Sequence, residues 1–149
     1  MNAKMISAGV LLVCLGFIAG IASSVADEDG FESEHRLVIQ INSNDQRMQE
    51  MALTNIVNLQ KHYGIDNIEI EVVAYGPGLH MVTEKSPVMQ RITSLMQSDV
   101  VFTACGNTIS TIAETMGVKP QIIEGVGNVK TGVARIIELQ EAGWSYFRP

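Results

Sequence analysis

The sequence predicts an α/β fold in which a mainly parallel sheet of five strands carries helices on its faces. Short apolar runs alternate with segments of helical periodicity, in the order βαβαβαβαβ. Strands that alternate with helices form parallel sheets, because each crossover returns the chain to the same edge. The run at residues 100–104 is continuously apolar, as in a strand buried on both faces. A length of 149 residues suits one such domain.

The first 26 residues have the pattern of a removable signal peptide. Lys4 precedes an apolar stretch over residues 5–22, and Ser24 and Ala26 form a small-x-small cleavage site. We therefore expect cleavage after Ala26, a periplasmic protein and no membrane contact once the peptide is removed. A retained membrane anchor is the alternative, because the apolar stretch approaches the length that spans a bilayer.

The chain after the signal peptide is acidic. Residues 27–35 are polar and predict a mobile leader, and residues 36–149 form the α/β domain. All 16 acidic residues follow Ala26, whereas Lys4, one of the ten basic residues, precedes it, so the mature protein has a net charge of −7. Nucleic acid requires a positive surface, so we expect no nucleic-acid partner.

The first half of the domain contains two strands and a long helix. Residues 37–41 predict the first strand, and residues 42–45 offer caps for a helix that ends at Gly64. Residues 68–74 alternate and then become apolar, which predicts the second strand. Residues 75–78 (YGPG) predict a turn.

The second half begins with a helix at Ser86-Pro87, a cap followed by proline at the first helical position. Strand three follows at residues 100–104, and the next helix ends at Gly117. The residues expected on the buried faces of these two helices are Val88, Met89, Ile92, Leu95 and Met96, then Ile109, Ile112, Ala113 and Met116.

Two weaker signals complete the sheet. Ile122-Ile123 predicts a fourth strand, and residues 133–140 predict a helix that ends at Gly143. The aromatic segment 144–148 predicts the last strand, and its aromatic area predicts an oligomer.

Three strand-to-helix loops are expected at the carboxyl edge of the sheet, where open α/β sheets bind ligands. They are Asn42–Asp45, Tyr75–His80 and Cys105–Thr108. The residue types that can perform chemistry lie in these loops, so the site is predicted there.

Cys105 is the candidate reactive residue. Cys14 lies in the signal peptide, so Cys105 has no partner within the mature chain. An exported protein usually pairs its cysteines, so a single one predicts an intermolecular disulfide or a thiol kept for its reactivity. A helix start directly after Cys105 would stabilise a thiolate. Gly106 would give access to the sulfur, and Asn107 or Thr108 would cap the helix. An inert buried cysteine is the alternative.

The loop after the second strand supplies the other candidate binding residues. Gly76 and Gly78 would form a backbone cradle beside Cys105, with Tyr75, His80 and Asn42 at its rim. A simple turn with a solvated histidine is the alternative. No histidine or cysteine spacing indicates a metal site, so we expect no metal and no cofactor.

Four segments together resemble the DsrE/DsrF-like (YchN-like) family. They are EVVAYGPGL (residues 71–79), Ser86-Pro87, VVFTACGNT (residues 100–108) and GVARIIELQEAGWSYFRP (residues 132–149). The resemblance covers residues 36–149 and implies a five-stranded, mainly parallel sheet between helices, assembled as a trimer or hexamer. Better known relatives pass persulfide sulfur through a cysteine after strand three, the place of Cys105. They follow it with an arginine-containing helix start, where this chain has Gly106-Asn107-Thr108.

The resemblance and the position of Cys105 together predict a periplasmic sulfur-binding or sulfur-relay protein that carries sulfane sulfur as a persulfide, with a donor or acceptor protein as partner. A non-catalytic oligomeric binding protein for a small anion or a protein partner is the alternative. A scaffold without a site is the third hypothesis.

Overall fold

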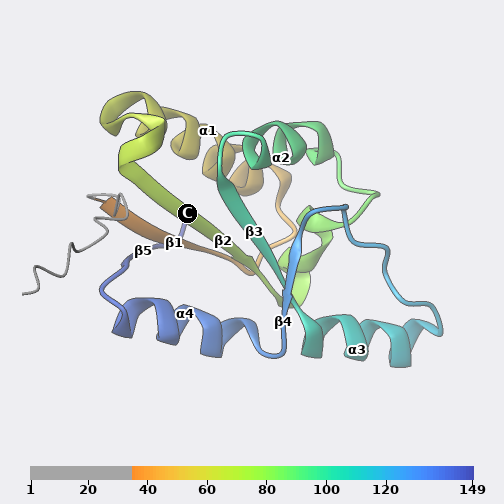
Figure 1. The fold of residues 1–149 in the computed structure, drawn as a ribbon. Helices are drawn as coiled ribbons and strands as arrows, with labels where there is room; N and C mark the ends of the chain where they lie inside the picture. The colour runs from red at the N-terminus through yellow and green to blue at the C-terminus, as the bar shows by residue number, and fades with distance from the viewer. Residues whose placement is uncertain (1–34) are drawn as a thin grey trace, which may run out of the picture. The chain divides into compact units, whose positions relative to one another are not determined.

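The structure, a computed structural model, describes residues 35–149, so the predicted signal peptide and residues 27–34 of the predicted leader lie outside the described residues. Figure 1 shows strands and helices in alternation. The elements are β1 (His35–Ile41), α1 (Gln46–Tyr63), η1 (Ile65–Asn67), β2 (Ile68–Ala74), η2 (Gly76–Val82), α2 (Met89–Met96), β3 (Val100–Cys105), α3 (Gly106–Met116), β4 (Gly127–Val129), α4 (Gly132–Glu141) and β5 (Ser145–Phe147).

The predicted α/β fold is confirmed. The five strands form one sheet in the order β4-β3-β2-β1-β5, and every pair is parallel. Ala74 at the end of β2 pairs with Ile41 of β1 and with Ala104 of β3. The carboxyl ends of the three central strands therefore meet at one edge.

The two faces of the sheet carry cores of different size. The larger core includes Leu53 of α1, Ile92 of α2 and Phe102 of β3, all buried. The smaller core lies under α4 and joins Val38 and Val73 of the sheet to Ile136 and Leu139, with Tyr75 and Trp144 packed against it. Figure 1 shows α1 and α2 on one side of the sheet and α4 on the other.

Local sequence signals account for the helix ends. The Asp45 carboxylate accepts hydrogen bonds from the N–H groups of Arg47 (2.8 Å) and Met48 (3.3 Å), as expected of an N-cap. Gly64 follows α1 with φ 93°, and Gly117 follows α3 in the left-handed region. Both glycine stops were predicted from the sequence.

The predicted fourth strand is wrong in position. Ile122 forms one isolated antiparallel bridge with Thr83, and buried Ile123 donates its N–H to the Val82 carbonyl at 3.0 Å. The parallel strand β4 lies further along, at Gly127–Val129, where its residues are half-buried or exposed. An edge strand of three residues buries little apolar area, so it leaves no hydrophobic pattern in the sequence.

Several other boundaries and faces differ from the prediction. Helix α2 begins at Met89, after a turn in which the Ser86 hydroxyl accepts the Val88 N–H at 3.3 Å. Met89 is 38 % exposed and Met116 is 72 % exposed, so neither belongs to the core as predicted. The predicted turn at residues 75–78 extends into a 3₁₀ helix, η2.

No helix between residues 35 and 149 combines the length and the apolar composition of a bilayer-spanning segment.

Candidate functional site at Cys105

Cys105 joins β3 directly to α3, without an intervening loop. It is the last residue of the strand and the N-cap of the helix, and 5 % of its surface is exposed. Asn107 and Thr108, predicted as possible caps, instead occupy the first turn of α3. The partial positive charge carried by the N–H groups of that turn is therefore adjacent to the sulfur.

A second helix also begins at the sulfur. Gly132 is the first residue of α4, and its N–H donates to Cys105 Sγ at 3.3 Å. A Cβ at Gly132 would lie 3.2 Å from Cys105 Cβ and 3.3 Å from both Tyr75 Cβ and Val73 Cγ1. Glycine at this position thus allows α4 to approach the sulfur. Figure 1 shows α3 and α4 starting near the carboxyl ends of β3 and β4 and running in opposite directions.

The Thr108 hydroxyl links the sulfur to the loop after β2. Thr108 Oγ1 accepts the N–H of Gly76 at 3.0 Å, and the same hydroxyl, as a donor to the sulfur, lowers the pKa of Cys105. Because the backbone N–H occupies one side of the oxygen, the hydroxyl hydrogen is free to point at the sulfur. Gly76, predicted as part of a backbone cradle beside Cys105, is thus connected to the sulfur through Thr108.

Burial and hydrogen bonding act in opposite directions on the Cys105 thiol. Burial raises its pKa, because a thiolate loses hydration, whereas donors lower it by binding the charged form. In order of effect, the donors are the Thr108 hydroxyl and the backbone N–H groups of Gly132, Thr108 and Asn107. The Asn107 N–H contributes least, since it is directed at the Lys130 carbonyl at 3.0 Å. Their sum exceeds the effect of burial, so the pKa of Cys105 lies below its ordinary value.

Gly106 and Asn107 hold the elements around the site together. A Cβ at Gly106 would lie 3.1 Å from both Asn128 Oδ1 and the Val129 carbonyl oxygen, so glycine here accommodates β4. Asn107 donates its backbone N–H to the Lys130 carbonyl at 3.0 Å and its side-chain amide to Thr131 Oγ1 at 3.2 Å. These two bonds hold the β4–α4 connection against the start of α3.

The remaining predicted rim residues divide into two groups. Tyr75 is half-buried, and its Cβ lies beside Gly132 and hence beside Cys105. Gly78 packs against the end of β1: a Cβ there would lie 2.3 Å from the Ile41 carbonyl oxygen and 2.8 Å from the Asn42 N. His80 is exposed and lines a separate cavity of about 490 Å³.

The cavity beside His80 has a mainly apolar lining, and Cys105 is not part of it. Besides Gly76 and His80, it is formed by Pro77, Leu79, Thr83, Glu84, Lys85, Ile112, Met116, Val118, Lys119, Pro120 and Gln121. Neither His80 nor Asn42 makes a contact that would place it at the sulfur. Among residues 35–149, no group of three or more histidine, cysteine, aspartate or glutamate side chains is arranged to hold a metal ion.

Comparison with known proteins identifies the family. A scan against protein-family models finds no match, and a search of curated proteins finds none either. Among solved structures, MTH1491 of Methanobacterium thermoautotrophicum, a protein of unknown function, is 31 % identical with a TM-score of 0.69. The match covers 77 % of this chain and 99 % of MTH1491. The chain belongs to the family of this protein, the DsrE/YchN-like family.

Two further structures resemble this DsrE/YchN-like chain. BT1422 of Bacteroides thetaiotaomicron, a conserved protein of unknown function, has a TM-score of 0.55 at 16 % identity, over 76 % of this chain and 94 % of that one. The ychN protein of E. coli has a TM-score of 0.47 at 14 % identity, over 78 % of this chain and 97 % of that one. The similarity to BT1422 shows a shared fold.

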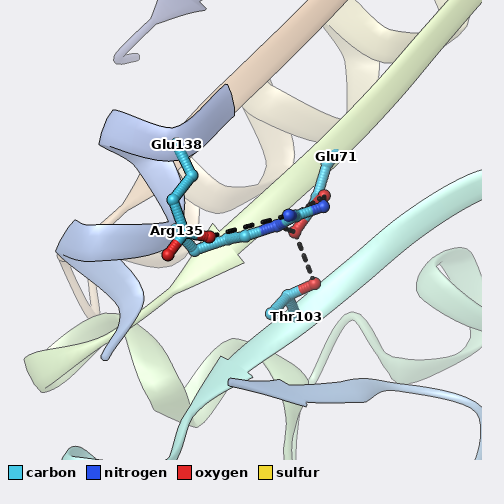
Figure 2. A network of polar contacts seen from close by, with 4 residues as sticks. All are labelled: Glu71, Thr103, Arg135 and Glu138. Atoms are coloured by element: carbon cyan, nitrogen blue, oxygen red, sulfur yellow. Dashed lines mark hydrogen bonds and ion pairs between the residues drawn. The ribbon is translucent and has the colours of Figure 1, made fainter. Parts of the chain in front are cut away.

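Sequence reasoning missed the α4 side of the site in this DsrE/YchN-like domain. Thr131 and Gly132 were not singled out, although a threonine and a glycine before a helical pattern are typical of a helix start. It also missed Glu71, a carboxylate in a largely buried strand, which pairs with Arg135 (Figure 2). A charge in an apolar run was the available signal.

Proposed function

We propose that the mature protein is a periplasmic sulfur carrier that holds sulfane sulfur as a persulfide on Cys105. The observation that supports this most strongly is the meeting of two helix N-termini at one sulfur, with the Gly132 N–H at 3.3 Å. Such a site stabilises a negative charge on sulfur, and a persulfide, like a thiolate, is anionic. Membership of the DsrE/YchN-like family agrees with the proposal.

The loading step is a thiol–disulfide-type exchange. The Cys105 thiolate attacks the terminal sulfur of an inorganic polysulfide, a new S–S bond forms, and the adjacent S–S bond of the polysulfide breaks. The polysulfide, one sulfur shorter, leaves with the electron pair, and the outer sulfur of the persulfide carries the negative charge. In unloading, an acceptor thiolate attacks that outer sulfur and Cys105 leaves as the thiolate. No external oxidant or reductant is needed in either direction.

Intact mass spectrometry tests the proposal. Protein treated with polysulfide and freed of excess reagent should gain about 32 Da, the mass of one sulfur, and lose it on reduction. Cys105→Ser should show no gain. If the wild-type protein gains no mass while its thiol still reacts with a small alkylating reagent, Cys105 is not a sulfur carrier.

The periplasmic location has its own test. Mature protein recovered from the periplasm should begin at Asp27 by N-terminal sequencing, as the Ser24-Val25-Ala26 pattern predicts. Protein that retains Met1 and sediments with the membrane would show that the segment is an anchor.

A second function is favoured by the burial of the thiol. With 5 % of its surface exposed, Cys105 offers little room to a bulky sulfur donor, whereas the converging N–H groups suit a small bound anion. In this case the protein binds an anion or a protein partner without covalent chemistry. Cys105→Ser would then bind the same ligand with an unchanged affinity, measured by isothermal titration calorimetry.

A further inference from the structure

An ion pair between a buried carboxylate and a half-buried guanidinium joins α4 to the sheet one helical turn from the candidate site. Glu71 of β2 is 3 % exposed, and Arg135 of α4 reaches it with two parallel hydrogen bonds, from Nε to Oε1 at 3.0 Å and from a terminal nitrogen to Oε2 at 2.7 Å. Thr103 of β3 donates to Glu71 Oε1 at 2.8 Å. Figure 2 shows these side chains converging between α4 and the two strands.

Two members of this network, Arg135 and Thr103, are close in the chain to parts of the sulfur site. Arg135 lies three residues after Gly132, and its backbone N–H closes the first turn of α4 on the Thr131 carbonyl at 3.1 Å. Thr103 lies two residues before Cys105, and alternate residues of a strand face the same side. The sulfur and its Gly132 donor are thus attached to the two elements that Glu71 ties together.

The geometry of the pair suits a positioning role. A guanidinium that binds a carboxylate through two bonds fixes orientation as well as distance, which one point contact does not. Arg135 also has an exposed partner, Glu138, at 3.8 Å. The ion pair with buried Glu71, at 2.7 Å, is the stronger of the two, because exposed ion pairs are screened by solvent. The Gly132 N–H reaches Cys105 Sγ at 3.3 Å, and because hydrogen bonds weaken steeply with misalignment, a small rotation of α4 would weaken this contact.

We propose that the Glu71–Arg135 ion pair, with Thr103, is a positioning device that aims the Gly132 N–H at the Cys105 sulfur. The inference rests on the proposed function, because it matters only if the sulfur is held as an anion. Arg135 acts through the backbone of α4 and does not touch the sulfur. Among the described residues, burial and hydrogen bonds are the causes that shift the pKa of Cys105. The charge of Arg135 is not among these causes.

The test measures the pH midpoint of Cys105 alkylation in Arg135→Met and in Glu71→Gln. Losing the Gly132 hydrogen bond should raise the midpoint by about one pH unit, the scale on which one donor to an ionised group acts. The amide resonance of Gly132, which should follow the thiol titration in the wild type, should lose that response. Arg135→Lys keeps the charge but not the two-point contact, so its alkylation midpoint should lie between those of the wild type and Arg135→Met.

Two controls separate positioning from general destabilisation. Glu138→Gln removes only the exposed partner of Arg135, and Leu53→Ala loosens the core on the other face of the sheet. Neither should shift the midpoint, even where thermal unfolding shows that Leu53→Ala is as destabilised as Arg135→Met. If Arg135→Met does not fold, the double variant Glu71→Gln/Arg135→Met, which leaves no buried charge, takes its place.

A folded Arg135→Met or double variant with the wild-type midpoint and an unchanged Gly132 response would overturn the inference. That outcome differs from failure of the proposed function. The latter would appear in the wild-type protein as an absent mass gain with polysulfide, whatever the variants do.

Discussion

Thr108 gives Cys105 a donor that does not depend on the helix backbone. The hydroxyl sits between the Gly76 N–H and the sulfur, so its hydrogen is directed at a thiolate. Thr108→Val keeps the shape of the side chain but removes this donor and leaves the Gly76 N–H unpaired. We expect the alkylation midpoint of Cys105 to rise by about half a unit to one unit, the usual scale for one hydrogen bond to a charged group.

Thr108→Ser is the matched control, because serine retains the hydroxyl. Its midpoint should stay within about 0.3 units of the wild type, because the hydrogen-bond donors to the sulfur are unchanged. Equal shifts in the two variants would mean that the methyl group, and not the hydroxyl, supports the site.

The lowered pKa of Cys105 also makes a prediction about stability. A thiol whose folded-state pKa lies below its unfolded value contributes stability above the unfolded value, and this contribution is lost as the pH falls through the folded value. The free energy of unfolding of the wild type, relative to Cys105→Ser, should therefore grow as the pH rises from about 6 to 9. Urea unfolding across this range measures it, and a difference that shrinks would indicate a raised pKa.

At the scale of residues, the sequence predicted the strand-to-helix junction at Cys105 but not the residues that other elements bring to it. Cys105, Gly106, Asn107 and Thr108 are contiguous, so a strand followed by a helix was enough to predict them together. Gly132 lies 27 residues further along and reaches the sulfur only because β4 pairs with β3. Contacts made through tertiary pairing leave no local pattern in the sequence.

At the scale of elements, η2 depends on a close approach to the end of β1. A Cβ at Gly78 would lie 2.3 Å from the Ile41 carbonyl oxygen, a backbone atom that cannot turn aside. We expect Gly78→Ala to destabilise the domain by about 3 kcal/mol, the upper range for overpacking. Thermal unfolding checks this.

Gly127→Ala provides the comparison for that substitution. A Cβ at Gly127 in β4 would lie no closer than 3.6 Å to its neighbours, an ordinary contact. Its effect should stay within about 0.5 kcal/mol. Equal losses of stability in the two variants would show that η2 can shift to accommodate a Cβ at position 78.

The elements themselves were predictable in proportion to the apolar area they bury. Strands β1, β2 and β3 and helix α1 bury apolar faces, and periodicity placed them within a few residues. Strand β4 buries little, and the fourth strand was assigned instead to Ile122-Ile123, whose backbone bonds to the end of η2 and the residue after it. The glycine stops at Gly64 and Gly117 were predictable because they depend on local backbone conformation.

At the scale of the whole molecule, the exposed apolar side chains support the proposed oligomer. The aromatic segment contributes less than its composition suggested, because Trp144 and Phe147 pack against the chain's own cores. Val133 and Ile137, one turn apart on α4, are 46 % and 51 % exposed, and Val101 of β3 is 50 % exposed. Apolar side chains gathered on one face are typical of an interface.

Light scattering tests this association. At micromolar concentration we expect the mass of a trimer or hexamer, and Ile137→Glu should lower it by placing a charge on the apolar face of α4. Val118→Glu makes the same change at an exposed side chain outside this face and should leave the mass unchanged. A monomer mass for the wild type would exclude the oligomer.

The most direct test of Cys105 as a stabilised anion is the pH dependence of its alkylation in the wild-type protein. A cysteine without stabilising neighbours titrates near about 8.5. With two helix N-termini and the Thr108 hydroxyl at the sulfur, the rate should reach half its maximum clearly below that value. A midpoint at or above about 8.5 would mean that burial outweighs the donors, and the sulfur-carrier proposal would be withdrawn.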